Sequence, residues 1–206
     1  RGLGDVYKRQ KLGTGGVHFQ GCVVVKVDRG EGEATGETVR VKHADAVTIV
    51  ADVRTDYKNG QYESLCEKTV EKAIARPFET MKEEHVADYA PLFARVSLKL
   101  ADDSKKSIPV DRRGKALCEG NKDAGLQALF FQYGRYLTIA SSRENSPLPI
   151  ALQGFFNDNL ACNMCWTSDY HLDINTEQNY WLTNVGNLAE CNAPLFLSLI
   201  HISEPT

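Results

Sequence analysis

The sequence predicts a mixed β and α fold, in which the C-terminal part of a β-sandwich leads through a helical linker into the opening of a larger all-α unit. Short β-branched runs fill the first part of the chain, a polar stretch with two helical patterns follows, and long amphipathic helices dominate the rest. We predict the end of the β-sandwich domain at 11–58, the linker at 59–120 and the start of the all-α unit at 121–196.

Three segments with β-branched residues are expected to be strands: Val17–Val27, Glu37–Lys42 and Ala46–Val50. Gly- and Asp-rich turns, DRGEGEATG and HADA, separate them. Such short strands joined by tight turns are typical of an antiparallel sandwich.

Two helices are expected in the linker, at Ser64–Ala75 and Glu83–Val96. Ser64 and Glu67 have the spacing of a capping box, which predicts Ser64 as the N-cap. The stretch Lys99–Gly120 is rich in charge and is expected to be a solvated connector.

The strongest helical periodicity covers Lys122–Ser141, with apolar residues at three- and four-residue steps. A long loop is expected at Ser142–Ser168 because it contains Pro and several Asn. A second helix is predicted at Asn175–Ala193, ended by Pro194, with one face formed by Trp181, Val185, Leu188 and Asn192. Two helices cannot close a domain, so they must open a larger helical unit.

Composition excludes several classes of function. The net charge of -3 gives no basic face for nucleic acid, and no apolar run is long enough to span a membrane. Cys162 and Cys165 form a C-x-x-C without two further ligands at compact spacing, so we expect neither a metal nor another cofactor. Both ends, 1–10 and 197–206, differ in character from the rest and are expected to be non-native.

The densest polar and aromatic stretch surrounds the start of the last predicted helix. His171, Asp173 and Asn175 alternate, so an extended segment would point all three to one side. A ring, a carboxyl and an amide in a row suit the hydroxyl groups of a sugar. The alternative is that Asn175 caps the helix and Glu177 lies in its first turn.

Several long motifs in this region occur in a fixed order: LFFQYGRYLTIASSR (129–143), LQGFFND (152–158) and SDYHLDINTEQNYW (168–181), together with HVADYAPLFARVSL (85–98) upstream. In these motifs the chain resembles glycoside hydrolase family 95, the α-L-fucosidase family. The resemblance implies a β-sandwich, a helical linker and an (α/α)6 catalytic barrel. It also implies an exo-acting hydrolase that releases terminal α-1,2-linked L-fucose from oligosaccharides or glycans with inversion.

The resemblance assigns roles to residues of this sequence. The family's N-x-N motif, whose asparagines assist the catalytic base, falls on residues 173–175; Asn175 matches it and Asp173 departs from it. His171 matches a position that contacts the sugar. Both catalytic carboxylates of the family lie downstream of this motif, so the chain is expected to be an inactive part of the enzyme.

Three further residues are candidate substrate-binding groups. Trp166 would line the sugar pocket or lie in the core or rim, and Gln153 and Asn157 would contact substrate or hold their loop. Because Asp173 replaces an amide, an α-L-galactosidase of the same family is one alternative function, and a non-catalytic carbohydrate-binding fragment is another. The expected location is the bacterial periplasm or the extracellular space.

Overall fold

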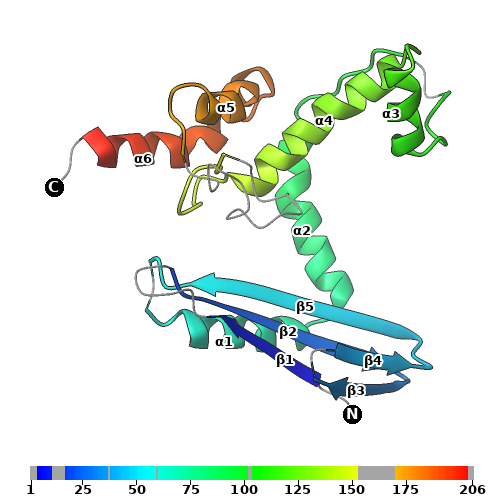
Figure 1. Cartoon of the computed structure of the whole chain (residues 1–206), viewed down its shortest axis with the longest axis vertical. Helices are drawn as coiled ribbons and strands as arrows, with labels where there is room; N and C mark the ends of the chain where they lie inside the picture. Colours follow the sequence, from blue (N-terminus) through cyan, green and yellow to red (C-terminus); the bar gives the residue numbers. More distant parts are fainter. Residues whose placement is uncertain are drawn as a thin grey trace. The chain divides into compact units, whose positions relative to one another are not determined.

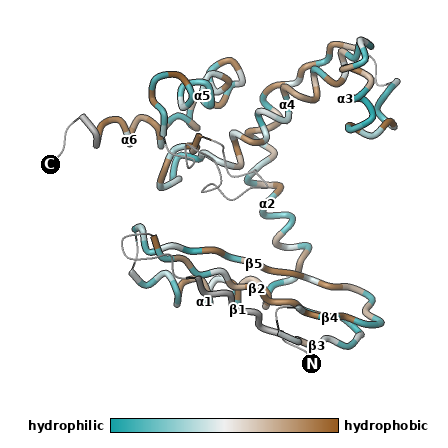
Figure 2. Tube along the Cα trace, viewed as in Figure 1, coloured by the Kyte–Doolittle hydropathy of each residue, from teal (hydrophilic) through white to brown (hydrophobic). Residues whose placement is uncertain are grey.

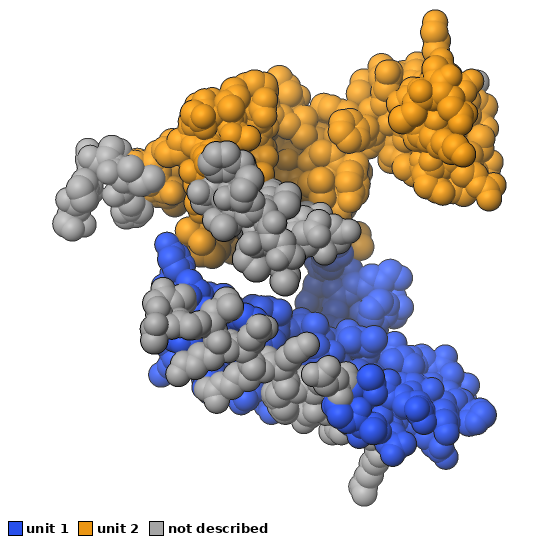
Figure 3. All heavy atoms as spheres, viewed as in Figure 1, with its two compact units in different colours: residues 1–85 blue, residues 86–206 orange. Residues whose placement is uncertain are grey.

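The computed structural model describes residues 4–10, 17–36, 38–58, 60–101, 104–152 and 170–203. The chain divides into two compact units, Arg1–His85 and Val86–Thr206, which Figure 3 distinguishes by colour. The domain boundaries predicted at residues 58 and 120 stay predictions.

The first unit contains two small antiparallel sheets. A three-stranded sheet has the order β1-β2-β5, and β3 and β4 form a separate two-stranded sheet. The strands are β1 (Gly4–Gln10), β2 (Phe19–Asp28), β3 (Glu31–Thr35), β4 (Thr38–Lys42) and β5 (Ala46–Thr55). In the register of β2 with β5, Cys22 lies opposite Asp52 and Val24 lies opposite Val50.

The helix α1 (Tyr62–Ile74) packs on one face of the three-stranded sheet (Figure 1). Its buried residues Cys66 and Val70 join Cys22 and Val24 of β2 in one apolar cluster. The alternation of β2 places every second side chain on this face. The other face of β5 stays open in the described residues, because Ile49 and Val53 are each 66% exposed.

The predicted strands are confirmed in position, but two details of this region were wrong. The segment DRGEGEATG is not only a turn, because β3 begins at Glu31 inside it and pairs with β4. The last strand continues to Thr55, five residues beyond the predicted end at Val50. Polar residues such as Asp52 and Arg54 interrupt the β-branched pattern, so the sequence did not predict this extension. Backbone pairing with β2 nevertheless keeps both residues in the strand.

The helix α1 begins two residues earlier than predicted, and its cap is different. Gln61 is at the N-cap position and makes no side-chain capping bond. Ser64 lies inside the helix, where its hydroxyl donates to the Gln61 carbonyl. Glu67 instead accepts from the Gln20 side chain of β2, so tertiary packing overrides the capping-box pattern.

The second unit is helical. It contains the end of α2 (Phe78–Phe93), which crosses the boundary between the units, and then α3, α4, α5, η2 and α6 (Figure 1). These last five elements cover Val110–Cys118, Ala124–Ser141, Asn175–Val185, Ala189–Asn192 and Ala193–Ser203. The solvated connector predicted at Lys99–Gly120 contains a helix that was not predicted, because α3 occupies its second half.

The helix predicted at Asn175–Ala193 is broken into three pieces. Gly186 ends α5, a short 3-10 turn follows, and α6 then begins at Ala193. Pro194 therefore opens α6 and does not end a helix, which suits a residue that lacks an N–H donor. The origin of β1 and of the end of α6, both in ranges expected to be non-native, stays a prediction.

The second unit is built on a small apolar cluster of Leu92, Ile139, Leu188 and Cys191. Many other apolar side chains are exposed: Phe130, Tyr133, Trp181, Val185, Phe196 and Ile200 are all more than half exposed. Figure 2 shows the apolar residues along α6 in brown. The predicted face of Trp181, Val185, Leu188 and Asn192 was wrong, because the first two are exposed and the last two are buried.

Candidate functional site

The residues predicted to contact a sugar lie around the start of α5, and the Tyr180 hydroxyl holds this helix in place. It accepts from the Ile150 amide at 2.8 Å and lies 3.0 Å from the Ser142 hydroxyl. Ser142 donates to the Cys191 carbonyl at 2.8 Å, so Tyr180 must be the donor to Ser142. Burial raises the pKa of Tyr180, which keeps this hydroxyl neutral.

Two more hydrogen bonds connect α5 and the residue Tyr170 before it to the segment that follows α4. The Asn179 amide donates to the Ala151 carbonyl at 3.2 Å, and the Tyr170 hydroxyl donates to the Pro149 carbonyl at 3.0 Å. The described residues on the two sides of 153–169 are therefore joined by hydrogen bonds, Tyr170 to Pro149 and Asn179 to Ala151.

The segment before α5 is a turn and not an extended strand. The Thr176 amide donates to the His171 carbonyl at 2.9 Å, which folds residues 172–174 into a turn. His171 is half-buried, whereas Asp173 and Asn175 are exposed. The predicted alternation of all three on one side was therefore wrong, because the backbone closes a local hydrogen bond instead of extending.

Asn175 is not the cap of α5. Ile174 is at the N-cap position without a side-chain capping bond, and Asn175 is the first helical residue. The alternative that Asn175 serves as a helix cap is thus contradicted, while Glu177 lies in the first turn as expected. Asp173, just before the helix, places a second carboxylate near its positive end. The exposed Asn175 amide stays available to a ligand.

The other predicted binding residues, Trp166, Gln153 and Asn157, lie outside the described residues. Cys162 and Cys165 do too. Their proposed roles stay predictions.

Arg135 fixes the opposite end of α5. The guanidinium is fully buried and donates at 2.7–3.1 Å to the carbonyl groups of Leu92, Phe93, Val96 and Gly186 and to the Gln132 side chain. It also lies 5.5 Å from the centre of the Phe93 ring. Burial lowers the pKa of Arg135, and the carbonyl groups compensate the charge by hydrogen bonding.

Arg135 was not among the site residues predicted from the sequence. It is the one charged residue within Ala124–Ser141, an otherwise apolar and neutral helix. A single guanidinium on such a helix was the signal that could have identified it, since buried charges are almost always fully paired.

Gly186 allows this contact. A Cβ atom added there would lie 2.7 Å from the Leu182 carbonyl and 3.5 Å from Cγ of Arg135. The first distance is too short for any real side chain, so only glycine fits the backbone at the end of α5, where the Gly186 carbonyl accepts from Arg135.

One buried polar group next to the predicted site lacks a partner. Among the described residues, the Thr176 hydroxyl is buried and makes no hydrogen bond. Thr176 directly follows Asn175, so an unsatisfied hydroxyl lies inside the first turn of α5.

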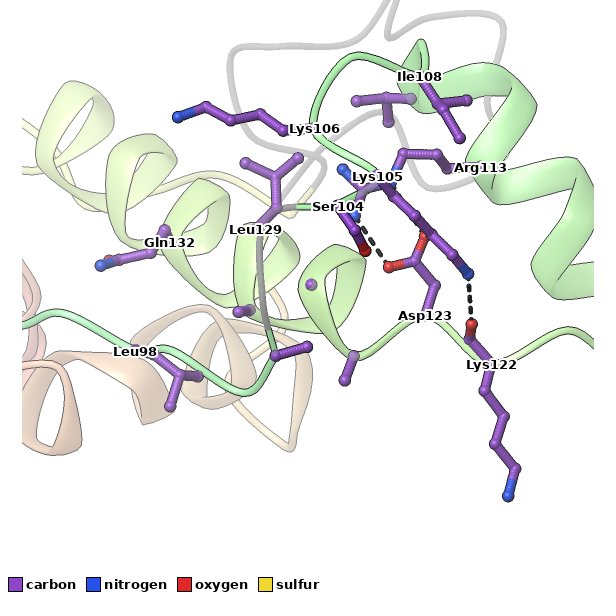
Figure 4. Close-up of a pocket in the computed structure, with 15 residues that line it drawn as sticks. Leu98, Ser104, Lys105, Lys106, Ile108, Arg113, Lys122, Asp123, Leu129 and Gln132 are labelled. Atoms are coloured by element: carbon purple, nitrogen blue, oxygen red, sulfur yellow. Dashed lines mark hydrogen bonds and ion pairs between the residues drawn. The ribbon is translucent and has the colours of Figure 1, made fainter.

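A cavity of about 440 Å³ lies elsewhere in this unit, between α3 and α4 (Figure 4). Asp123 at the start of α4 accepts two hydrogen bonds from Arg113 of α3, at 2.9 and 3.0 Å, and one from the Leu126 amide. These bonds, those from Arg113 above all, lower the pKa of Asp123 to about 2. The Asp123 carboxylate is occupied by the ion pair with Arg113 and by the cap of α4. None of the described candidates His171, Asp173 and Asn175 lines the cavity.

Within the described ranges, no three His, Cys, Asp or Glu side chains gather closely enough to hold a metal ion. No described helix has both the length and the apolar character needed to cross a membrane.

The sequence of the second unit matches a known family. Residues 77–206 match the glycosyl hydrolase family 95 catalytic domain. The chain belongs to glycosyl hydrolase family 95. The matched range includes α4, α5, the turn at 172–174 and Arg135.

Three relatives of the chain carry fucosidase names. It is 28% identical over 198 residues to "Alpha-L-fucosidase 2" of Arabidopsis thaliana, covering 88% of this chain and 23% of the relative. It is 33% identical over 132 residues to "Probable alpha-fucosidase A" of Aspergillus niger, covering 63% and 16%. The protein of that name from Aspergillus oryzae is 30% identical over 186 residues, covering 79% and 24%. The family 95 chain thus spans less than a quarter of the length of each relative.

Proposed function

We propose that this chain is part of an inverting exo-glycoside hydrolase that releases terminal α-1,2-linked L-fucose from oligosaccharides or glycans. The observation that carries the proposal is the match of residues 77–206 to the family's catalytic domain, together with relatives named as fucosidases. An end of a β-sandwich and the first helices of an (α/α)6 barrel are the proposed architecture. The open apolar faces of β5 and of the second unit's helices support it.

We propose that the residues of this site assist catalysis and do not themselves transfer the protons. An inverting hydrolase needs one carboxylic acid for the leaving oxygen and one carboxylate to activate water. We assign both to the rest of the protein, downstream of α5. Asn175 orients the water or the base carboxylate, because its amide both donates and accepts hydrogen bonds. His171 contacts the sugar.

The test is an assay of the complete protein on oligosaccharides that carry fucose in α-1,2 and in other linkages. Proton NMR of the first product distinguishes the mechanisms, since inversion of an α-fucoside gives β-L-fucose first. Initial release of α-L-fucose would exclude inversion, and release from another linkage alone would exclude the proposed specificity.

Asp173 favours a second candidate, an α-L-galactosidase of the same family. An ionised carboxylate cannot donate a hydrogen bond and would repel a nearby base carboxylate, unlike the amide that it replaces. If Asp173 sets the substrate, Asp173→Asn in the complete protein should raise kcat/KM for α-L-fucosides relative to α-L-galactosides by about 10-fold, the size of one net hydrogen bond. The measurement is kcat/KM on the matched pair of substrates.

Glu177→Gln is the matched control for that substitution, since it removes a nearby charge in the first turn of the same helix. An equal change of preference in both variants would mean that overall charge, and not Asp173, decides the substrate. A complete protein that binds fucosylated glycans and cleaves none would support the third possibility, a carbohydrate-binding protein without catalysis.

The proposed location is the extracellular space or a bacterial periplasm. The three relatives come from a plant and from fungi, so they do not support a bacterial source. A signal peptide in the complete reading frame is the observation that would support secretion.

A further inference from the structure

Two cysteines of the first unit meet in its core. Cys22 lies on β2 and is 2% exposed, and Cys66 lies on α1 and is fully buried. Both belong to the apolar cluster between the helix and the sheet. They are 44 positions apart in the sequence, yet no other element separates them.

The hydrogen bonds of Cys66 place its sulfur over Cys22. The Cys66 thiol lies 3.5 Å from the Gln20 carbonyl and 3.3 Å from the Asp52 carbonyl. Asp52 is the residue directly opposite Cys22 in the β2–β5 ladder, and Gln20 is two residues before Cys22 on the same face. These two carbonyl groups therefore bracket Cys22.

A contact of the Cys22 sulfur itself also defines its position. The Gln20 amide nitrogen lies 3.6 Å from the Cys22 sulfur, so Gln20 contacts both cysteines. Because Gln20, Cys22 and Val24 alternate toward the helix, the Cys22 side chain points to α1. The two side chains thus point at each other across one helix–sheet interface.

We propose that Cys22 and Cys66 form an intramolecular disulfide that joins β2 to α1 when the protein folds in an oxidising environment. The two thiols lose two protons and two electrons, and one S–S bond forms. A low-molecular-weight disulfide accepts them and is reduced to two thiols. In a reducing compartment the pair stays as free, buried thiols, as in this structure.

The bond should form during folding and not in the folded protein. Burial, with a contribution from the neighbouring Cys22 sulfur, raises the pKa of the Cys66 thiol to about 12. The thiolate is the reactive form, so a folded and reduced protein should react slowly. In the unfolded chain both thiols are accessible and near their ordinary pKa.

Oxidative refolding tests the proposal directly. The full chain is reduced in denaturant, refolded with reduced and oxidised glutathione, and alkylated with N-ethylmaleimide. After proteolysis, mass spectrometry should find the peptide of Cys22 linked to the peptide of Cys66, lighter by two hydrogen atoms than the two free peptides together. Recovery of both cysteines as alkylated peptides, or as bonds to other cysteines, would overturn the proposal.

Thermal unfolding gives a second readout that needs no variant. Closing a loop of this length should raise Tm of the oxidised protein above that of the reduced protein by roughly 5 °C or more. Cys22→Ala and Cys66→Ala should each abolish the linked peptide and this difference. Cys118→Ala, at an exposed position, should change neither. Equal Tm values for oxidised and reduced wild type, with the bond present, would show that the native geometry is strained and reject a stabilising bond.

Discussion

At the scale of single residues, Asn175 and Arg135 have opposite environments. Asn175 is exposed at the start of α5, whereas Arg135 is fully buried against its end. An exposed amide that caps nothing is free to act on a ligand, and a buried guanidinium with only carbonyl and amide partners holds backbone in place. The two residues therefore call for different measurements.

Asn175→Ala in the complete enzyme should lower kcat by about 100-fold, the size expected for one polar group positioned on the transition state. KM should change less, because the proposed interaction is with water or the base and not with bound sugar. The measurement is steady-state kinetics together with Tm. An unchanged kcat with a lowered Tm would mean that the residue serves the fold alone.

Arg135→Lys should destabilise the chain by about 2–4 kcal/mol, because a lysine cannot satisfy the same set of carbonyl groups. Urea unfolding measures this difference. Arg95→Lys is the matched control: Arg95 contacts the Asn187 carbonyl and Glu190 but is about one-third exposed. It should cost less than about 1 kcal/mol. Similar losses in both variants would contradict the structural role of Arg135.

At the scale of helices and strands, a charged pair stabilises the N-terminus of α4. Asp123 caps the helix through the Leu126 amide and binds Arg113 of α3. Its pKa of about 2 in the folded chain lies below the ordinary value near 4. The resulting stabilisation is complete above about pH 4 and is lost as the pH falls to about 2.

Asp123→Asn should therefore be less stable than wild type at pH 7 and should lose less of its stability between pH 4 and pH 2. Asparagine still caps helices well, so the variant separates the charge from the cap. The measurement is urea unfolding across this pH range. Glu144→Gln removes an exposed carboxylate and should leave the profile of wild type. Parallel profiles for wild type and Asp123→Asn would exclude the pair as the cause.

The sequence predicted the existence of most elements but not their ends. The apolar steps of α4 and the β-branched run of β2 are strong local signals, and both elements lie where they were expected. The capping box at Ser64 and the helix end at Pro194 failed because tertiary contacts and the break at Gly186 decide those positions. The candidate residues His171, Asp173 and Asn175 lie at the start of α5, and their role as a site stays a prediction. The local hydrogen bond of the His171 carbonyl could not be predicted from the alternation of these residues.

At the scale of the whole molecule, each unit leaves apolar surface open in its described residues. Ile49 and Val53 on β5 and Phe130, Trp181 and Val185 in the second unit are each at least 61% exposed. Apolar faces of this kind are unusual on a complete domain and mark surfaces that bind further structure. Trp181 and Val185 follow the helical period of α5 but are exposed among the described residues, so periodicity alone gave a poor prediction of burial for this helix.

The purified 206-residue chain should release no fucose from α-1,2-fucosylated oligosaccharides, because the proposed acid and base belong to the rest of the protein. It should also bind a dye for exposed apolar surface more strongly than the complete protein does. The measurements are a fucose-release assay and dye fluorescence on equal molar amounts. Turnover by the chain, at a rate above a heat-inactivated sample, would contradict the placement of both carboxylates.

The close approach of the Leu182 carbonyl to Gly186 limits which residues can replace this glycine. A single methyl group there would collide with the Leu182 carbonyl and disturb the end of α5, where the Gly186 carbonyl accepts from Arg135. The neighbouring Val185 is 75% exposed and can change with little effect on the fold. Two adjacent positions therefore differ sharply in mutational tolerance. In a saturation library of the complete enzyme, variation at 185 would survive selection for a folded protein, whereas position 186 would return to glycine.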